Sequence, residues 1–266
     1  MHARAALTTM YSAVPGRPGR SRLSTLRSQA PLVLRPTSIT QCEPWVGTRS
    51  DVARVSLAAG AAGPVGGDQL SLHVSVGPGS TLVLSEISAS LLLPGVHAEQ
   101  SCTRTQIHVA AGGTFVWLPQ PMIAAAGCHH LNDVRVELEE GARLLMREEV
   151  LLGRHGEAPG NLAQHVQVRL EGRPLYRQDL DFGPHAPGWD SPAVTGAHRA
   201  LGSVLIVDPD WGDGTPPAQV LDDDAAVLPL TGPAVLISAV SLDSVALRRA
   251  LTAGLHALGA PWGPPA

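Results

Sequence analysis

The residues best suited to chemistry are carboxylates in the central part of the chain. Glu148 and Glu149 are adjacent, and Glu157 follows in the same segment. Paired carboxylates act as general acid and base in glycoside hydrolysis, whereas carboxylate oxygens can also hold a divalent cation and release it. Three interpretations stay open: a carbohydrate-active enzyme, a polar groove or passage, and an ordinary solvated strand edge.

Cys128, His129 and His130 form the densest group of potential metal ligands. Thiolate and imidazole suit borderline metals such as nickel and zinc. Neighbouring residues of an extended strand point to opposite faces, so one site cannot easily use all three. We expect a structural or surface role, or at most a transient metal contact. The isolated protein should bind nickel weakly, without a tight thiolate site.

Several function classes are excluded or disfavoured by composition and motifs. The chain has no lysine, which excludes Schiff-base chemistry on lysine and the lysine of a P-loop. The motifs HExxH, GxSxG and the Rossmann GxGxxG are absent. A net charge of −4 and 3% aromatic residues disfavour nucleic-acid binding. Three widely spaced cysteines predict neither a disulfide framework nor a structural zinc site.

The elements that must position these residues show a repeat. The segments 76–82, 109–115 and 138–144 superimpose without gaps on the glycines Gly79, Gly112 and Gly141. Each is a glycine turn between alternating apolar segments, and a repeat of this period is typical of stacked supersecondary units. We therefore predict a mainly β fold with β-solenoid-like stacked strands.

The chain is predicted to form one domain over residues 1–266. Residues 1–29 should be a partly flexible N-terminal segment that contains short strands, and residues 208–224 a long acidic loop. A strand at Val235–Val240 should lead into a C-terminal helix, capped by Asp243 or Ser244 and ending at Gly259. No apolar run approaches the roughly 20 residues of a membrane span, and no secretory signal is recognisable. The cytoplasm is the expected compartment.

Three motifs in a fixed order carry a family resemblance. They are GPVGGDQL (63–70), TFVWLPQP (114–121) and EEVLLGRHGE (148–157). Together they resemble the urease accessory protein family UreD, also called UreH, over most of the chain. The matching positions are Gly66, Gly67 and Asp68, then Trp117 to Gln120, then Gly153 and Arg154, with Glu157 at a shorter spacing than the family usually has. The segment after Ser90 and the segment Ala58–Ala62 depart from the family pattern.

The resemblance implies a non-enzymatic scaffold. Such proteins join the accessory proteins UreF and UreG, the latter a GTPase, on apo-urease and help deliver nickel to its active site through an internal passage. No tightly bound cofactor is expected, only transient nickel. The resemblance is compatible with a dimer of accessory complexes. It makes Gly66, Gly67, Asp68, Trp117, Gln120, Glu148, Glu149, Arg154 and Glu157 candidates for partner contact or for the passage.

Overall fold

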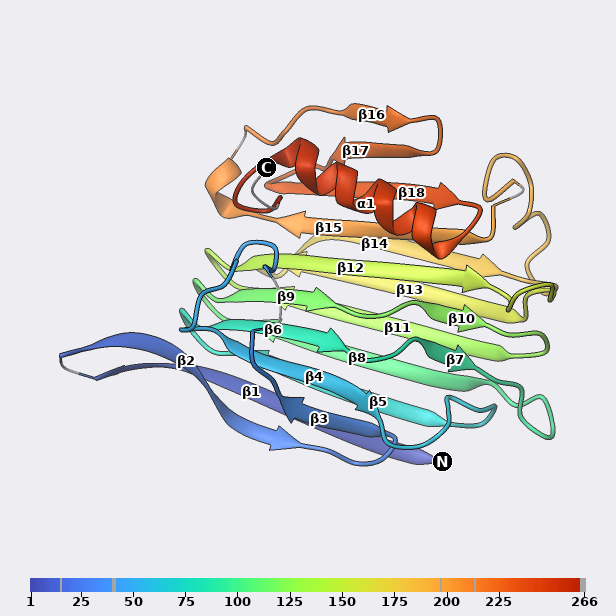
Figure 1. The fold of residues 1–266 in the computed structure, drawn as a ribbon, viewed down its shortest axis with the longest axis horizontal. Helices are drawn as coiled ribbons and strands as arrows, with labels where there is room; N and C mark the ends of the chain where they lie inside the picture. Colours follow the sequence, from blue (N-terminus) through green and yellow to red (C-terminus); the bar gives the residue numbers. More distant parts are fainter. Residues whose placement is uncertain (15, 40–41, 197, 213, 264–266) are drawn as a thin grey trace.

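Two stacked β-sheets form the molecule, as a computed structural model shows for residues 1–14, 16–39, 42–196, 198–212 and 214–263 (Figure 1). Sheet A has seven strands in the order β14-β13-β11-β8-β5-β1-β2. These strands are β1 (His2–Val14), β2 (Arg17–Arg27), β5 (Gln69–Val76), β8 (Ser101–Val109), β11 (His129–Leu138), β13 (Asn161–Leu170) and β14 (Arg173–Phe182). The five strands from β1 to β13 in this order pair in parallel.

Sheet B has the order β16-β17-β18-β15-β12-β9-β6-β4-β3, with two short strands beside it. Its strands are β3 (Leu32–Pro36), β4 (Ala53–Ala59), β6 (Thr81–Glu86), β7 (Ser90–Leu92), β9 (Thr114–Leu118), β10 (Met122–Ala124), β12 (Arg143–Leu152), β15 (Ala200–Val207), β16 (Gln219–Asp222), β17 (Ala225–Pro229) and β18 (Ala234–Ser241). The chain alternates between the sheets, so that β5–β6, β8–β9 and β11–β12 are successive coils of a solenoid. The predicted β-solenoid-like fold is confirmed.

The repeated glycines are the turns of these coils. Gly79, Gly112 and Gly141 all have φ between 62° and 68°, a left-handed conformation that glycine adopts without steric cost. The turns also bond to one another, since Gly79 N donates to the Ala111 carbonyl and Gly112 N to the Glu140 carbonyl, both at 3.0 Å. The glycine repeat of the sequence is therefore a stacked ladder of turns along one edge.

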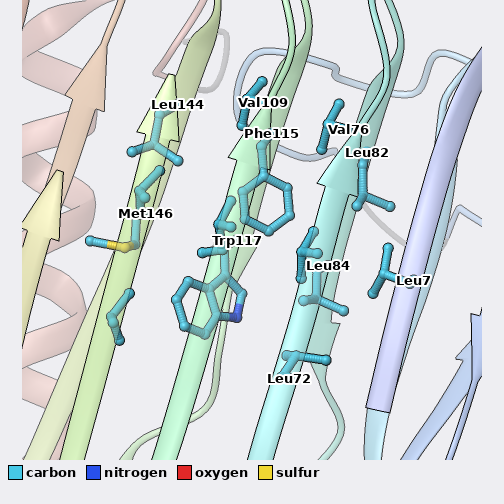
Figure 2. Close-up of a cluster of buried hydrophobic side chains, with 14 of the residues drawn as sticks. Leu7, Leu72, Val76, Leu82, Leu84, Val109, Phe115, Trp117, Leu144 and Met146 are labelled. Atoms are coloured by element: carbon cyan, nitrogen blue, oxygen red, sulfur yellow. The ribbon is translucent and has the colours of Figure 1, made fainter. Parts of the chain in front are cut away.

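The main core lies between the sheets. Alternate residues of each strand point inward, so that Val76 and Val109 of sheet A meet Leu82, Phe115 and other apolar side chains of sheet B. Figure 2 shows these side chains in one continuous layer, and the rings of Phe115 and Trp117 stack with their centroids 6.4 Å apart. Toward the end of the layer near Trp117 the inward-facing residues become polar, which is where the candidate site begins.

A second core lies between the outer face of sheet B and helix α1 (Ser244–Leu258). Asp243 is the N-cap of this helix, as predicted, because its Oδ1 accepts hydrogen bonds from Val245 N and Ala246 N. Gly259 follows the last helical residue with φ 70°. Leu247, Leu251 and Leu255 are buried against the sheet. Among the described residues, no helix is long and apolar enough to cross a bilayer.

Strands lie in two segments that were predicted as a partly flexible N-terminal segment with short strands and as a long acidic loop. Residues 1–29 contain β1 and β2, which pair with each other and join sheet A through the parallel contact of β1 with β5. The acidic segment 208–224 is not one long loop. Asp208 accepts a hydrogen bond from Asp210 N and caps a short 3-10 helix, η1 (Pro209–Trp211), and β16 pairs with β17. Asp213 of that segment lies outside the described residues.

Candidate functional site

Sheet B has an opening where two neighbouring strands are interrupted. The strand line of β6 and β7 breaks at residues 87–89, and that of β9 and β10 breaks at Pro119–Gln120–Pro121. The adjacent strand β12 is continuous: residues 143–146 pair with β9 and residues 150–152 with β10. Its residues Arg147, Glu148 and Glu149 therefore lie beside the gap. On the side that faces β9 and β10, these three charged residues have no partner strand in the described part of the chain.

The rim of this opening is held by specific hydrogen bonds. Neither Pro119 nor Pro121 has a backbone N–H, so the gap leaves few donors to satisfy. The Pro119 carbonyl accepts from Arg147 Nη2 at 2.9 Å, and Gln120 N donates to Glu86 Oε2 at 3.2 Å. The Pro121 carbonyl accepts from Ser90 N at 3.0 Å. The WLPQP motif thus ends a strand and stabilises the opening.

Behind the opening, a chamber of about 120 Å³ lies between the sheets. Its walls combine apolar side chains such as Leu72 and Met122 with polar ones. Three buried polar atoms on its walls have no hydrogen-bond partner among the described residues: Trp117 Nε1, His130 Nε2 and Glu148 Oε2. Buried polar groups without a protein partner are normally satisfied by water or a ligand. These three atoms are therefore positions on an otherwise largely apolar wall at which water or a ligand can form hydrogen bonds.

Burial shifts the pKa values of Glu148 and His130, two potential metal ligands on the chamber wall. Glu148 accepts a hydrogen bond from Gln164 Nε2 at 2.8 Å, but burial raises the pKa of its carboxyl to about 7. Burial, with a smaller contribution from His129, lowers the pKa of His130 to about 4. His130 Nδ1 shares a 2.8 Å hydrogen bond with Ser101 Oγ. At neutral pH the imidazole is uncharged, and uncharged imidazole is the form that binds metals.

The raised pKa of Glu148 predicts a pH-dependent stability difference. The folded state holds a proton on this carboxyl up to about pH 7, whereas the unfolded state releases it near its ordinary value. Stability from this group is complete below the unfolded pKa and is lost as pH rises toward 7. We expect the free energy of unfolding of E148Q relative to wild type to increase between pH 5 and 7 in urea titrations. E148L, which also lacks the ionisable group, should show the same slope, and a flat difference for both would contradict the prediction.

Glu149 points to the opposite face of β12 and belongs to an ion cluster under α1. Arg248 of the helix donates to both of its carboxylate oxygens at 2.9–3.3 Å, and Arg147 Nε lies 2.8 Å from Oε1. Arg248 also donates to Gln120 Oε1 at 3.3 Å. Gln120 lines both the chamber and a groove of about 600 Å³ beside α1. The opening in sheet B thus lies between the chamber and this groove.

The carbohydrate-active alternative does not fit this arrangement. A glycosidase needs two carboxyl groups that flank one bond. Glu148 faces the chamber and contacts Gln164, whereas Glu149 faces the helix and is neutralised by two guanidinium groups. Both residues border the chamber, but the Glu149 carboxylate is held by its ion pairs with Arg147 and Arg248. The two carboxylates do not form a general acid–base pair.

The GGD motif supports the backbone. Gly66 packs against Gly95, so closely that a Cβ on Gly66 would lie 2.6 Å from Gly95 Cα. Gly67 has φ 85°, which favours glycine. Asp68 is buried and accepts from Val65 N at 2.9 Å and from the amino group of Met1 at 2.7 Å. Although burial raises the pKa of Asp68, these contacts lower it below its ordinary value. The motif closes a turn at the edge of the coil.

Replacing Gly66 with alanine should destabilise the protein more than the same change at Gly79. The Gly66 Cβ would overlap backbone atoms of Gly95 and Glu99, which cannot rotate away. Gly79 has open space around it and only a left-handed φ. We expect losses of about 3 kcal/mol for G66A and about 1 kcal/mol for G79A in chemical denaturation. Equal losses would show that the close approach of the two glycines is relaxed in solution.

The LLGRHGE motif forms a loop between β12 and β13. Arg154 and Glu157 make an exposed ion pair with nitrogen–oxygen distances of 2.6–2.7 Å, and the hydrogen bond from Arg154 lowers the pKa of Glu157 to about 2. Arg199 donates to the carbonyl of Leu152 at 2.7 Å and to that of Glu157. A Cβ on Gly153 would lie 2.6 Å from Arg199 Nη2. Arg154 and Glu157 lie outside the chamber and shape the loop.

The predicted Cys128–His129–His130 group is divided between the two faces of sheet A. His130 faces the chamber, and His129 faces outward. Cys128 is fully buried, and burial, followed by the charge of Glu157, raises the pKa of its thiol to about 11. Among the described residues, no three His, Cys, Asp or Glu side chains are placed to hold one metal ion. These three residues do not share a site.

Removing the Cys128 thiol should leave nickel binding unchanged. A thiol that stays protonated at neutral pH is a poor metal ligand, because the thiolate is the binding form. We expect C128A and wild type to give the same weak nickel affinity in calorimetric titrations at pH 7.5. A loss of affinity in C128A would mean that the thiolate takes part after all.

Comparison with known proteins agrees with the resemblance that the motifs carry. The family model described as "UreD urease accessory protein" matches residues 3–262. The chain belongs to the UreD family. The urease accessory protein UreD of Streptomyces avermitilis is 40% identical over 245 residues, which cover 92% of this chain and 93% of that protein. UreD 3 of Streptomyces griseus is 39% identical over 246 residues, covering 91% and 92%, and UreD of Frankia alni is 40% identical over 263 residues, covering 90% and 88%.

Several residues of this UreD site were not predicted from the sequence. Gln164 donates a hydrogen bond to Glu148, and Arg248 forms an ion pair with Glu149. Arg199 donates a hydrogen bond to the Leu152 carbonyl, next to Gly153. All three come from segments far along the chain, and only their spatial position reveals their role. For Gln164 a signal was present: it is polar at an inward position of a strand whose inward neighbours Leu162 and Val166 are apolar.

Proposed function

We propose that this chain is a non-enzymatic scaffold of urease maturation that helps transfer nickel to apo-urease. Its cargo would cross the molecule through the chamber and the opening in sheet B. The observation that supports the proposal is the set of unpartnered buried atoms on the chamber wall, above all His130 Nε2 and Glu148 Oε2. Imidazole nitrogen and carboxylate oxygen are ligands that divalent nickel accepts.

The chemistry of the chamber suits transfer better than storage. Two protein ligands and water would hold a divalent ion loosely, whereas a closed thiolate site would retain it. Binding of nickel to Glu148 displaces the proton that this carboxyl holds near neutral pH, so loading and proton release are coupled. The membership in UreD also supports UreF, UreG and apo-urease as partners and, together with free cysteines at 42, 102 and 128, the cytoplasm as compartment.

Complementation tests the proposal. In a strain whose own UreD is deleted, supplying this chain should restore urease activity and nickel content in purified urease. The same cells should yield this chain in complex with UreF and UreG homologues. A folded, expressed chain that restores neither activity nor nickel content would overturn the proposed function.

A further inference from the structure

Two histidines from distant parts of the sequence meet outside the chamber. His129 is the first residue of β11, and His185 lies in the loop that follows β14. Their ring centroids are 5.7 Å apart and their planes are nearly perpendicular, at 83°. Both line a groove of about 460 Å³ at the end of sheet A. Metal–nitrogen bonds of about 2.1 Å place the centres of two imidazoles on one ion roughly 5 Å apart, which is close to the separation of these two rings.

The backbone on both sides of the pair is held in place. Asn161 is the register partner of His129 in β13, and its Oδ1 accepts from His185 N at 2.7 Å. The Asn161 N donates to the Cys128 carbonyl at 2.7 Å. Gly183, just before His185, packs directly on the backbone of Gly160, where a Cβ would not fit. One asparagine and one glycine contact therefore fix both histidines to the same strand end.

The pair differs from the chamber in position and in chemistry. His129 faces outward and His130 inward, so the two histidines of β11 serve different sides of the sheet. The Nε2 of His129 has one polar neighbour, Gln100 Nε2 at 3.2 Å, which an incoming ion would replace. Imidazole pairs favour divalent nickel, copper, zinc and cobalt over magnesium or calcium.

We propose that His129 and His185 form a surface site for a divalent transition-metal cation, with water completing its coordination. With only two protein ligands the site binds weakly and exchanges its ion readily. The site stands independently of the proposed maturation role, because it requires only the metal and this chain. Where the ion is nickel, the site would hold cargo at the same strand ends that lead to His130.

The test is a titration of the purified chain with nickel chloride, read by calorimetry and by paramagnetic broadening of histidine ring signals. H129A, H185A and the double variant are compared with H155A, which removes an exposed histidine from the neighbouring loop. A chelating pair predicts that either single change lowers the affinity of this site at least about tenfold, and that the double variant loses no more than the singles. H155A should match wild type.

Two results would overturn the site. One is an H185A variant in which the broadening of the His129 ring signal by nickel is unchanged. The other is a set of losses that simply add, since independent histidines and not a chelate behave in this way. Both readouts use metal alone, so a negative result leaves the complementation test of urease maturation untouched. Circular dichroism of each variant confirms that the fold is kept.

Discussion

Replacing Glu148 with leucine is expected to reduce nickel loading of urease by about tenfold or more while leaving the protein folded. The change removes a buried carboxylate oxygen on the chamber wall that has no hydrogen-bond partner among the described residues and puts an apolar side chain in its place. Loss of a group in or beside a metal site typically costs 10–100-fold in affinity or activity. The measurement is nickel per urease active site after maturation in cells that carry only this variant.

Stability separates a functional loss from a folding defect in this experiment. Leucine replaces the buried carboxyl by an apolar group of similar size, but the buried Gln164 loses its hydrogen-bond partner, which costs about 1–3 kcal/mol. We therefore expect E148L to be less stable than wild type by about that amount and still to unfold in one cooperative transition. The matched control is E137L, which removes a glutamate from the exposed face of β11. Normal nickel loading by E148L would exclude the chamber as the path of the metal.

Truncating Trp262 to alanine should cause a large loss of stability, about 3–5 kcal/mol. The indole is 1% exposed, stacks on Trp45 with centroids 4.8 Å apart, and donates to Asp208 Oδ2 at 2.8 Å. Arg143 lies 4.9 Å above the Trp45 ring and 3.2 Å from Asp208 Oδ1. The Trp262 side chain thus connects the segment after α1 to Trp45 and to Asp208, the N-cap of η1, and Arg143 of β12 contacts both of these residues.

The variant W262F separates the contribution of ring stacking to stability from that of the hydrogen bond to Asp208. It keeps an aromatic ring against Trp45 but leaves the buried Asp208 oxygen without its indole donor, which should cost about 1–3 kcal/mol. Equilibrium denaturation of W262A, W262F, W45A and the double variant W45A/W262A measures the parts. If the two alanine changes add without coupling, the stacked pair does not act as one unit.

The fold could be predicted further than the site. Alternation of apolar residues and the repeated turns at Gly79, Gly112 and Gly141 are local signals, and local signals are enough for a stacked β architecture. The motif residues Gly66 and Gly67 were recognisable as a pattern, but that Gly66 serves a close contact with Gly95 depends on a second coil. A contact between coils leaves no trace in either segment alone.

The site could not be predicted from the sequence, because it depends on contacts between residues that are far apart in the chain. Glu148 and Glu149 look like a pair in sequence, and the pleat of β12 turns them to opposite sides. His129 looked like a partner of Cys128 and His130, whereas its neighbour in space is His185, which follows β12, β13 and β14 in the sequence. In each case the residue type was informative, but the partner was decided by strand direction and by the order of strands in the sheet.

The two prolines beside Gln120 have a consequence for how this protein can change. Because Pro119 and Pro121 cannot donate to a ladder, β9 and β10 cannot join into one strand, whereas β12 beside them runs unbroken. The opening in sheet B is therefore fixed by the two prolines. Substitutions of the lining side chains can change the size and charge of the opening without joining β9 to β10. The lining side chains can therefore vary while the two prolines keep the position of the opening in sheet B.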